Sequence, residues 1–136
     1  MLEFDSEIVG KDAQFGFLRD NIKRYGFSIG GNWEFHKGSF DTPLWKDGGD
    51  TIYLRLPFVV MNGMLDSENA QIRFLKPFVI RHIANVGLDY DDASLLEPTG
   101  FSQFQTPTDK DATITNKSKW ISAGEQAIDK VLPYLN

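Results

Sequence analysis

Two arginines in predicted strands are the residues of this sequence that best suit a binding site. Arg55 and Arg73 each lie between two large apolar residues. Because successive side chains of a strand point to opposite faces, both guanidinium groups should project from the face opposite the core. If the two strands pair as a hairpin across residues 62–68, both groups share that face. Four further polar side chains are expected there: Tyr53, Gln71, Glu34 and His36.

This candidate face has three interpretations. Guanidinium forks suit the two oxygens of a carboxylate, so that Arg55 and Arg73 could clamp an anion. They could also form a cross-strand charge network with Glu34, which would have a structural role only and which we favour over the clamp. Aromatic residues and Arg are also typical of subunit interfaces, and Val59 and Met61 add apolar area to the face.

The two histidines, His36 and His82, are the only imidazoles of the chain. Two His and a carboxylate can bind a metal ion, but no HxH, HxxxH or HExxH spacing brings these two onto one element. His36 falls on a polar strand face and His82 at the end of a strand. We therefore predict no metal site, and we include both histidines in the candidate binding or interface set.

Other motifs that carry chemistry do not match. The carboxylates at 89–92 resemble the start of a calcium loop, but Ala93 and Ser94 occupy its fifth and sixth positions, which need a ligand and a glycine. The Gly-Gly pairs at 30–31 and 48–49 lack the Lys-Ser/Thr of a phosphate loop, and no Gly-x-Ser-x-Gly elbow occurs. Without cysteine there is no thiolate nucleophile, thiolate zinc site or disulfide. We predict no catalytic residue and no cofactor.

Charge and hydropathy argue against two classes of partner. The 136 residues include 14 basic and 19 acidic side chains, which gives a net charge of −5 and a pI near 4.9. Generic nucleic-acid binding needs a positive field, and so we expect no nucleic-acid partner. The longest apolar run, 58–61, is far shorter than the ~20 residues of a membrane span. The first residues carry no basic or apolar leader, and a cytoplasmic protein without membrane attachment is expected.

The N-terminal part is predicted to contain a short strand within residues 2–9 and a helix from Lys11 to Tyr25. Apolar residues recur in the helix at intervals of three and four: Phe15, Leu18, Ile22 and Tyr25. Gly16 weakens the middle of this helix. Gly26 follows the last apolar position and suits the left-handed residue that ends a helix.

Between residues 27 and 80 the apolar period changes to two, which predicts a meander of about four antiparallel strands. The expected segments are 33–36, 40–45, 52–60 and 71–75. Pro43 indicates an edge or a bend in the second of them. The Asp-Gly pair within residues 46–50 is a hairpin signal, and residues 62–68 form the next loop.

The C-terminal part begins with an irregular segment, residues 81–112, where Pro, Gly and Asp interrupt both periods. A long irregular segment in a small domain is typical of a functional or mobile loop. A helix is predicted from about Asn116 to Leu132, and Pro133 ends it because proline lacks a backbone donor. At this length we expect a single domain, residues 1–136.

These elements predict an α+β fold in which an antiparallel sheet of about four to five strands packs on two helices, in the order β-α-β4-α. The order is that of the TATA-binding-protein-like or helix-grip architecture, where a curved sheet wraps a long C-terminal helix. This analogy concerns the fold and carries no function.

Several short motifs resemble the YugN-like family of bacilli. They are GGNWEF at 30–35, DTIYLRLP at 50–57, KPFVIRH at 76–82 and VGLDY at 86–90. Where such families have a second His in a Pro-His-Gly turn, this chain has Ala-Asn-Val-Gly at 84–87, which argues against a paired-His site. The resemblance implies the fold class and a bacterial cytoplasmic setting, and it supplies no catalytic residues.

Two functions follow as hypotheses, and the first is favoured. It is a non-catalytic binding or assembly module that self-associates through the open sheet face, as a homodimer. This hypothesis rests on the missing catalytic motif and on the aromatic and Arg content of the face. The second is a small-ligand carrier or enzyme with a pocket between the curved sheet and the C-terminal helix, covered by residues 81–112. It rests on that long segment and on the eleven phenylalanines.

Overall fold

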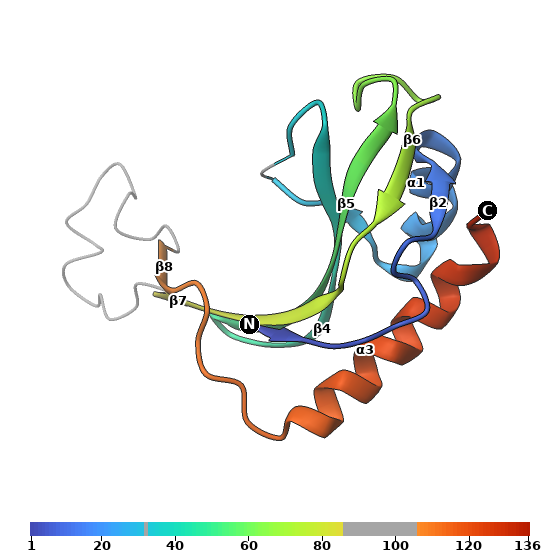
Figure 1. Ribbon diagram of the computed structural model, residues 1–136. Coiled ribbons are helices and arrows are strands. Elements are labelled where there is room, and N and C mark those ends of the chain that lie inside the picture. Colours follow the sequence, from blue (N-terminus) through green and yellow to red (C-terminus); the bar gives the residue numbers. More distant parts are fainter. Residues whose placement is uncertain (32, 86–105) are drawn as a thin grey trace, which may run out of the picture.

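A computed structural model describes residues 1–31, 33–85 and 106–136 (Figure 1). The helices are α1 (Phe15–Ile22), α3 (Lys117–Val131) and the 3-10 helices η1 (Lys23–Tyr25) and η3 (Leu132–Tyr134). The strands are β1 (Leu2–Glu3), β2 (Asp12–Gln14), β3 (Ser28–Ile29), β4 (Lys37–Asp47), β5 (Asp50–Asn62), β6 (Gln71–Phe74), β7 (Phe78–Asn85) and β8 (Thr106–Asp109). The predicted α+β class is confirmed.

The described strands form one antiparallel sheet of eight strands. Its order is β1-β7-β5-β4-β3, while β6 pairs with β5 and β2, and β8 pairs with β7. The long strand β5 is central: β4 follows one of its edges, and on the other edge β7 pairs with its first half and β6 with its second. Four to five strands was too few, because β1, β2, β3 and β8 are too short to leave a periodic pattern.

The predicted hairpin between β4 and β5 is confirmed. Gly48 and Gly49 connect two strands whose pairing begins at Asp47 and Asp50. Further along, the register shifts by one residue just after Pro43, so that β4 contains the irregularity that this proline indicated.

The first helix is shorter than predicted. Residues 12–14 form β2, which pairs with β6, and α1 begins only at Phe15. The apolar stripe is confirmed, since Phe15, Leu18 and Ile22 are buried. Gly26 has a φ of 88° and follows η1 in the left-handed conformation, as predicted.

Two further segments differ from the prediction. Residues 33–36 are not a strand, because Glu34 and Lys37 form an isolated bridge that closes a tight turn. Residues 81–85 belong to β7 and residues 106–109 to β8, so that these parts of the predicted irregular segment are in the sheet. The middle of this segment, which includes the carboxylates at 89–92, lies outside the described residues.

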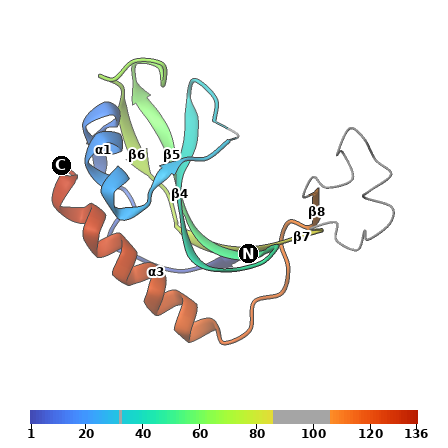
Figure 2. The same cartoon turned by 180° about the vertical axis from the view of Figure 1, so that it is seen from behind.

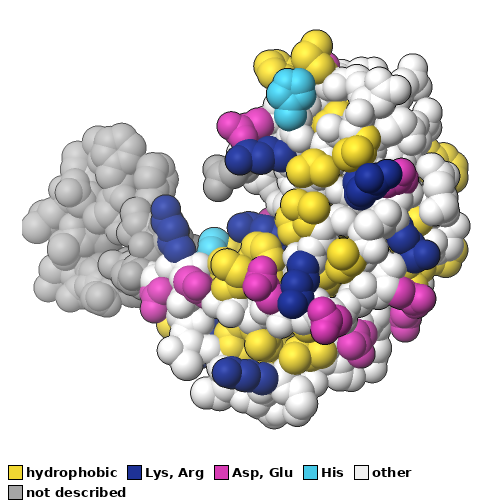
Figure 3. Space-filling model, in the orientation of Figure 1, with side chains coloured by type: hydrophobic (Ala, Val, Ile, Leu, Met, Phe, Trp, Pro, Cys, Tyr) yellow, Lys and Arg dark blue, Asp and Glu magenta, His cyan; other side chains and the backbone are white. Residues whose placement is uncertain are grey.

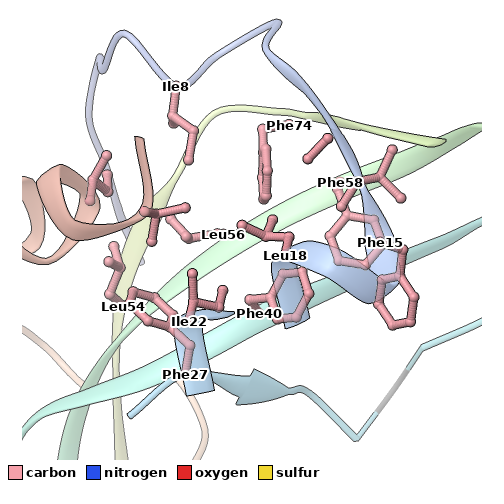
Figure 4. Close-up of a cluster of buried hydrophobic side chains, with 14 of the residues drawn as sticks. Ile8, Phe15, Leu18, Ile22, Phe27, Phe40, Leu54, Leu56, Phe58 and Phe74 are labelled. Atoms are coloured by element: carbon pink, nitrogen blue, oxygen red, sulfur yellow. The ribbon is translucent and has the colours of Figure 1, made fainter. Parts of the chain in front are cut away.

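The hydrophobic core lies between the sheet and the two α-helices. Alternate residues of β5, from Ile52 to Phe58, are buried there. Figure 4 shows side chains of α1 gathered with Phe40 and Phe58 of the sheet, whose ring centroids are 5.4 Å apart. The predicted C-terminal helix is confirmed as α3, which contributes Ile128 and Val131 to this core.

The sheet is strongly bent into two arms (Figure 1). The upright arm contains β6 and the second half of β5, and the horizontal arm contains β7 and the first half of β5. The bend falls where β5 changes partner, since Leu56 and Pro57 pair with neither β7 nor β6. Figures 1 and 2 place α1 and α3 on the convex side. The expected sheet wrapped around the C-terminal helix is therefore wrong, and no described helix covers the concave side.

Candidate functional site

The concave side of the bend carries the polar residues that best suit a site. Residues of β5 with odd numbers point to this side, away from the core. The strand register adds residues of β4 and β7 to the same side. We define the concave face by five side chains: Asp41, Tyr53, Arg55, Phe78 and His82. The molecule is visibly hollowed above these strands (Figure 3).

The strongest interaction on the concave face joins Arg55 to Asp41. The guanidinium donates from Nε to Oδ1 and from Nη2 to Oδ2, and both distances are 3.0 Å. Both side chains are largely covered, with 26% and 18% of their surface exposed. The guanidinium also lies 5.7 Å from the ring centroid of Tyr53 and 5.9 Å from that of Phe78. Arg55 is therefore a fixed, paired charge between two aromatic rings.

A second pair on the face is formed by Tyr53 and His82. The Tyr53 hydroxyl lies within hydrogen-bond distance of both imidazole nitrogens, Nδ1 and Nε2, and the two rings meet edge to face. Burial raises the pKa of the Tyr53 hydroxyl. Burial also lowers the pKa of His82, and the positive charges of Arg55 and Lys110 lower it further. The imidazole is thus neutral at pH 7, where it can accept or donate a hydrogen bond.

Arg73 does not join this cluster. It lies opposite Val59, on the same side of the sheet as Arg55 but four residues further along, or about 13 Å at the usual strand rise. Its guanidinium donates to both carboxylate oxygens of Asp12, at 2.7 and 3.1 Å. The two arginine forks thus bind separate carboxylates of this chain and do not converge on a common anion.

Glu34 and His36 lie at the end of the upright arm. Glu34 forms an ion pair with Lys37 rather than with the arginines, which corrects the expected charge network. The backbone oxygen of His36 accepts a hydrogen bond from Val60, whereas His82 pairs with Thr51 at the other end of β5. At about 3.3 Å per residue the two imidazoles are too far apart to bind one metal ion. The predicted set is thus split between the two arms.

A pocket of about 250 Å³ opens on the concave face beside Tyr53. Its lining comes from β3, β4 and β5 and includes Ser28, Asp41, Pro43, Lys46, Thr51 and Tyr53. Hydroxyl groups, the Asp41 carboxylate and the Lys46 amine therefore line this pocket. Asp41, Phe78 and Lys46 belong to this site and were not among the predicted residues, because their positions depend on the exact strand register.

A second pocket, of about 260 Å³, lies between β4 and α3. Its lining includes Tyr25, Leu44, Ala127 and Lys130. Towards the middle of the interface the helix sits directly on the core, since a Cβ atom added to Gly124 would lie 3.0 Å from the Phe4 ring. The described residues thus leave space between the sheet and α3 only at the edges of their interface.

The comparison with known families decides where this fold belongs. The model of the YugN-like family matches residues 3–135. The chain belongs to the YugN-like family. Its relatives include the uncharacterized protein YugN of Bacillus subtilis strain 168, which is 32% identical over 116 residues, or 84% of each chain. The uncharacterized protein YlbA of the same strain is 27% identical over 93 residues, which cover 68% of this chain and 77% of that one.

The family fold is also seen in a solved structure. The crystal structure of the uncharacterized conserved protein YugN from Geobacillus kaustophilus HTA426 has a TM-score of 0.69, with 20% sequence identity. The match covers 99% of this chain and 95% of that one. At this identity the likeness concerns the fold alone. In the ranges that the structure describes, no helix has the length and apolar character to span a membrane.

Proposed function

We propose that this protein is a non-catalytic assembly module that forms a homodimer through the concave face of its sheet. The observation that carries the proposal is that both arginines of this face are already paired within the chain, while Lys46 is exposed to solvent. Asp41 neutralises Arg55, and Asp12 neutralises Arg73. Among the described residues, no buried side-chain nitrogen or oxygen lacks a hydrogen-bond partner. A second copy can therefore cover the two arginines without isolating a guanidinium charge.

The composition of the face supports the same function. Tyr53 and Phe78 are half-buried, and Arg55 lies between them. Tyr, Phe and Arg are the residues enriched at the centre of protein interfaces, where charged groups are otherwise depleted. Val59 extends the face onto the upright arm. A protein surface thus suits the face better than a free anion, because both guanidinium forks already hold carboxylates.

The oligomeric state in solution tests this proposal. Analytical ultracentrifugation of the wild type at high micromolar concentration should detect a dimer, and a strict monomer would rule the function out. Val59→Glu places a carboxylate on the face opposite Arg73 and Lys37, where the folded monomer tolerates it. This variant should be monomeric, with the melting temperature that the wild type has when diluted below its dimer dissociation constant. The control is Gln126→Glu, an exposed change on the convex side that should leave the dimer intact.

A second candidate function is supported by the pocket between β4 and α3. Its walls combine Leu44 and Ala127 with the amine of Lys130, which suits a small carboxylate with an apolar tail. Octanoate is a suitable probe in a thermal-shift titration, since a ligand of the folded state raises the melting temperature. Ala127→Leu fills the pocket and should abolish the shift. No shift with the wild type would remove this candidate.

A further inference from the structure

The end of the upright arm carries four large apolar side chains that face solvent. Trp33, Phe35, Met61 and Met64 are 44%, 50%, 50% and 48% exposed. They come from the turn before β4, from the end of β5 and from the β5–β6 connection, which lie at the same end of the molecule (Figure 1). We call these four residues the tip patch. The largest exposed apolar patch of a soluble protein is often functional.

The tip patch is held in a fixed shape by its neighbours. The rings of Trp33 and Phe35 meet edge to face with centroids 5.9 Å apart. The backbone oxygen of Phe35 accepts a hydrogen bond of 3.0 Å from Leu65, which ties the turn to the β5–β6 connection. The neighbouring charges, Glu34 and Lys37, form an ion pair and add no net charge. The patch is therefore preformed, and the ion pair between Glu34 and Lys37 adds no net charge to it.

Burial area decides how two copies could use this patch. A large apolar side chain offers about 200 Å², and with half of each exposed the patch offers about 400 Å². Contact between two tips would bury about 800 Å² in total, which is the size of a crystal-packing contact. If each tip instead covered an equal area on the face of the other copy, the total would reach about 1,600 Å², the size of a standard stable interface.

The bent shape of the sheet permits this second arrangement. The tip patch ends the upright arm, whereas Tyr53 and its pocket lie on the horizontal arm. A two-fold axis perpendicular to the plane of the bend places each tip over the horizontal arm of the other copy. The two contacts are then equivalent, and the assembly closes as a dimer. The pocket beside Tyr53 has a volume of about 250 Å³. Its size suits a single aromatic side chain.

We propose that the tip patch of one copy binds the concave face of a second copy, with an aromatic ring of the tip in the pocket beside Tyr53. This inference rests on the proposed homodimer and names the surface that occupies the concave face. It also explains why the predicted interface residues are split between the two arms: Glu34 and His36 of one copy meet Tyr53, Arg55 and His82 of the other. Aromatic anchors that fill pockets on the partner are typical hot spots.

Crosslinking between two single-cysteine variants tests the arrangement, because the chain has no cysteine of its own. Met64→Cys is at the tip and Thr51→Cys lines the pocket. A mixture of the two variants, treated with a short bis-maleimide, should give a covalent dimer that neither variant gives alone. In the matched control, Ser122→Cys on the exposed side of α3 replaces Thr51→Cys, and it should give no covalent dimer with Met64→Cys. Absence of the mixed product would overturn the inference.

A double substitution at the tip separates this inference from the proposed function. Trp33→Ser with Phe35→Ser should raise the dimer dissociation constant at least tenfold, and an unchanged far-ultraviolet circular dichroism spectrum should show that the variant is folded, since about half of each residue is exposed. A double variant that dimerises like the wild type, while Val59→Glu is monomeric, would overturn the tip contact and leave the homodimer standing. A monomeric wild type would overturn both.

Discussion

Asp41 and Arg55 face each other across β4 and β5 and are joined by two parallel hydrogen bonds of 3.0 Å. The pair lies on the concave face, where most of both side chains is covered. Removal of either partner leaves the other as a half-buried charge without compensation. The pair therefore holds the face in its observed form and neutralises the charge of Arg55.

We predict that Asp41→Ala lowers the free energy of unfolding by about 1.5–3 kcal/mol, the usual cost of a lost hydrogen-bonded charge partner. Urea denaturation measures this difference. The matched control is Asp12→Ala, which removes the carboxylate from the more exposed Arg73 and should cost much less. If both variants lost the same free energy of unfolding, the burial of Arg55 would not strengthen its ion pair with Asp41.

The Asp41–Arg55 pair also shows how far the sequence determines this site. The Asp-Gly signal places the hairpin correctly. If β4 and β5 paired residue by residue from Asp47 and Asp50 without an irregularity, Thr42 would lie opposite Arg55. The observed partner is Asp41, because β4 has one extra residue next to Pro43. Proline predicts an irregularity at this place but does not tell whether it adds a residue. A single inserted residue exchanges the faces of a strand, and so Asp41 could not be assigned to the site from the sequence.

His82 gives a pH dependence whose sign can be derived. Its pKa lies below the ordinary value of 6.5 because of burial and then of the nearby charges of Arg55 and Lys110. Between the folded pKa and about 6.5 the unfolded chain binds more protons, so that stability is fully present above pH 6.5 and falls as the pH drops. We predict that His82→Gln has a flatter stability curve than the wild type between about pH 7.5 and pH 5.5. Urea midpoints across this range measure the slopes, and identical slopes would contradict the assignment.

Arg81 and Asp50 supply a second titration, at lower pH and on the other side of the sheet. The guanidinium donates to both carboxylate oxygens at 2.9 and 2.7 Å, and these hydrogen bonds hold the pKa of Asp50 below its ordinary 3.8. The resulting stability is present above pH 3.8 and is lost as the pH falls through the folded pKa. Asp50→Asn should therefore be less stable than the wild type at pH 7, and this difference should shrink in acid.

Thermal unfolding of both proteins from neutral to acidic pH measures the effect of Asp50→Asn. Asp129→Asn, on the exposed side of α3, is the matched control and should differ little from the wild type at any pH. A difference between Asp50→Asn and the wild type that persists unchanged in acid would mean that the asparagine disturbs packing rather than an ion pair.

Two features of the fold depend on contacts that no local pattern records. Strands of two or three residues such as β1 and β2 exist because a neighbouring strand offers free backbone groups, β7 for the first and β6 for the second. The open concave side follows from the change of partner along β5, which places the bend near Pro57. Apolar periodicity identified the buried face of β5 but contains no information on the direction in which the sheet curves.

Gly16 is a residue whose local and tertiary effects are opposite. By helix propensity its replacement by Ala should stabilise α1 by up to about 1 kcal/mol. In the folded protein, however, the first turn of α1 lies against the backbone of Glu68, whose oxygen accepts a hydrogen bond of 2.9 Å from the Gly16 amide. An added Cβ atom would lie 2.7 Å from the Glu68 Cβ and 2.9 Å from its backbone oxygen. This contact can be relieved only if the helix and the β5–β6 connection move apart.

We therefore predict that Gly16→Ala destabilises the protein by about 1–3 kcal/mol, the usual cost of overpacking. Urea denaturation measures this loss, with Ser122→Ala on the exposed side of α3 as a control that should be neutral or slightly stabilising. Because the connection that would move also carries Met64 of the tip patch, the same substitution should weaken the homodimer. A gain in stability for Gly16→Ala would show that the helix is free of Glu68 in solution, and that the tip is not held as the structure describes.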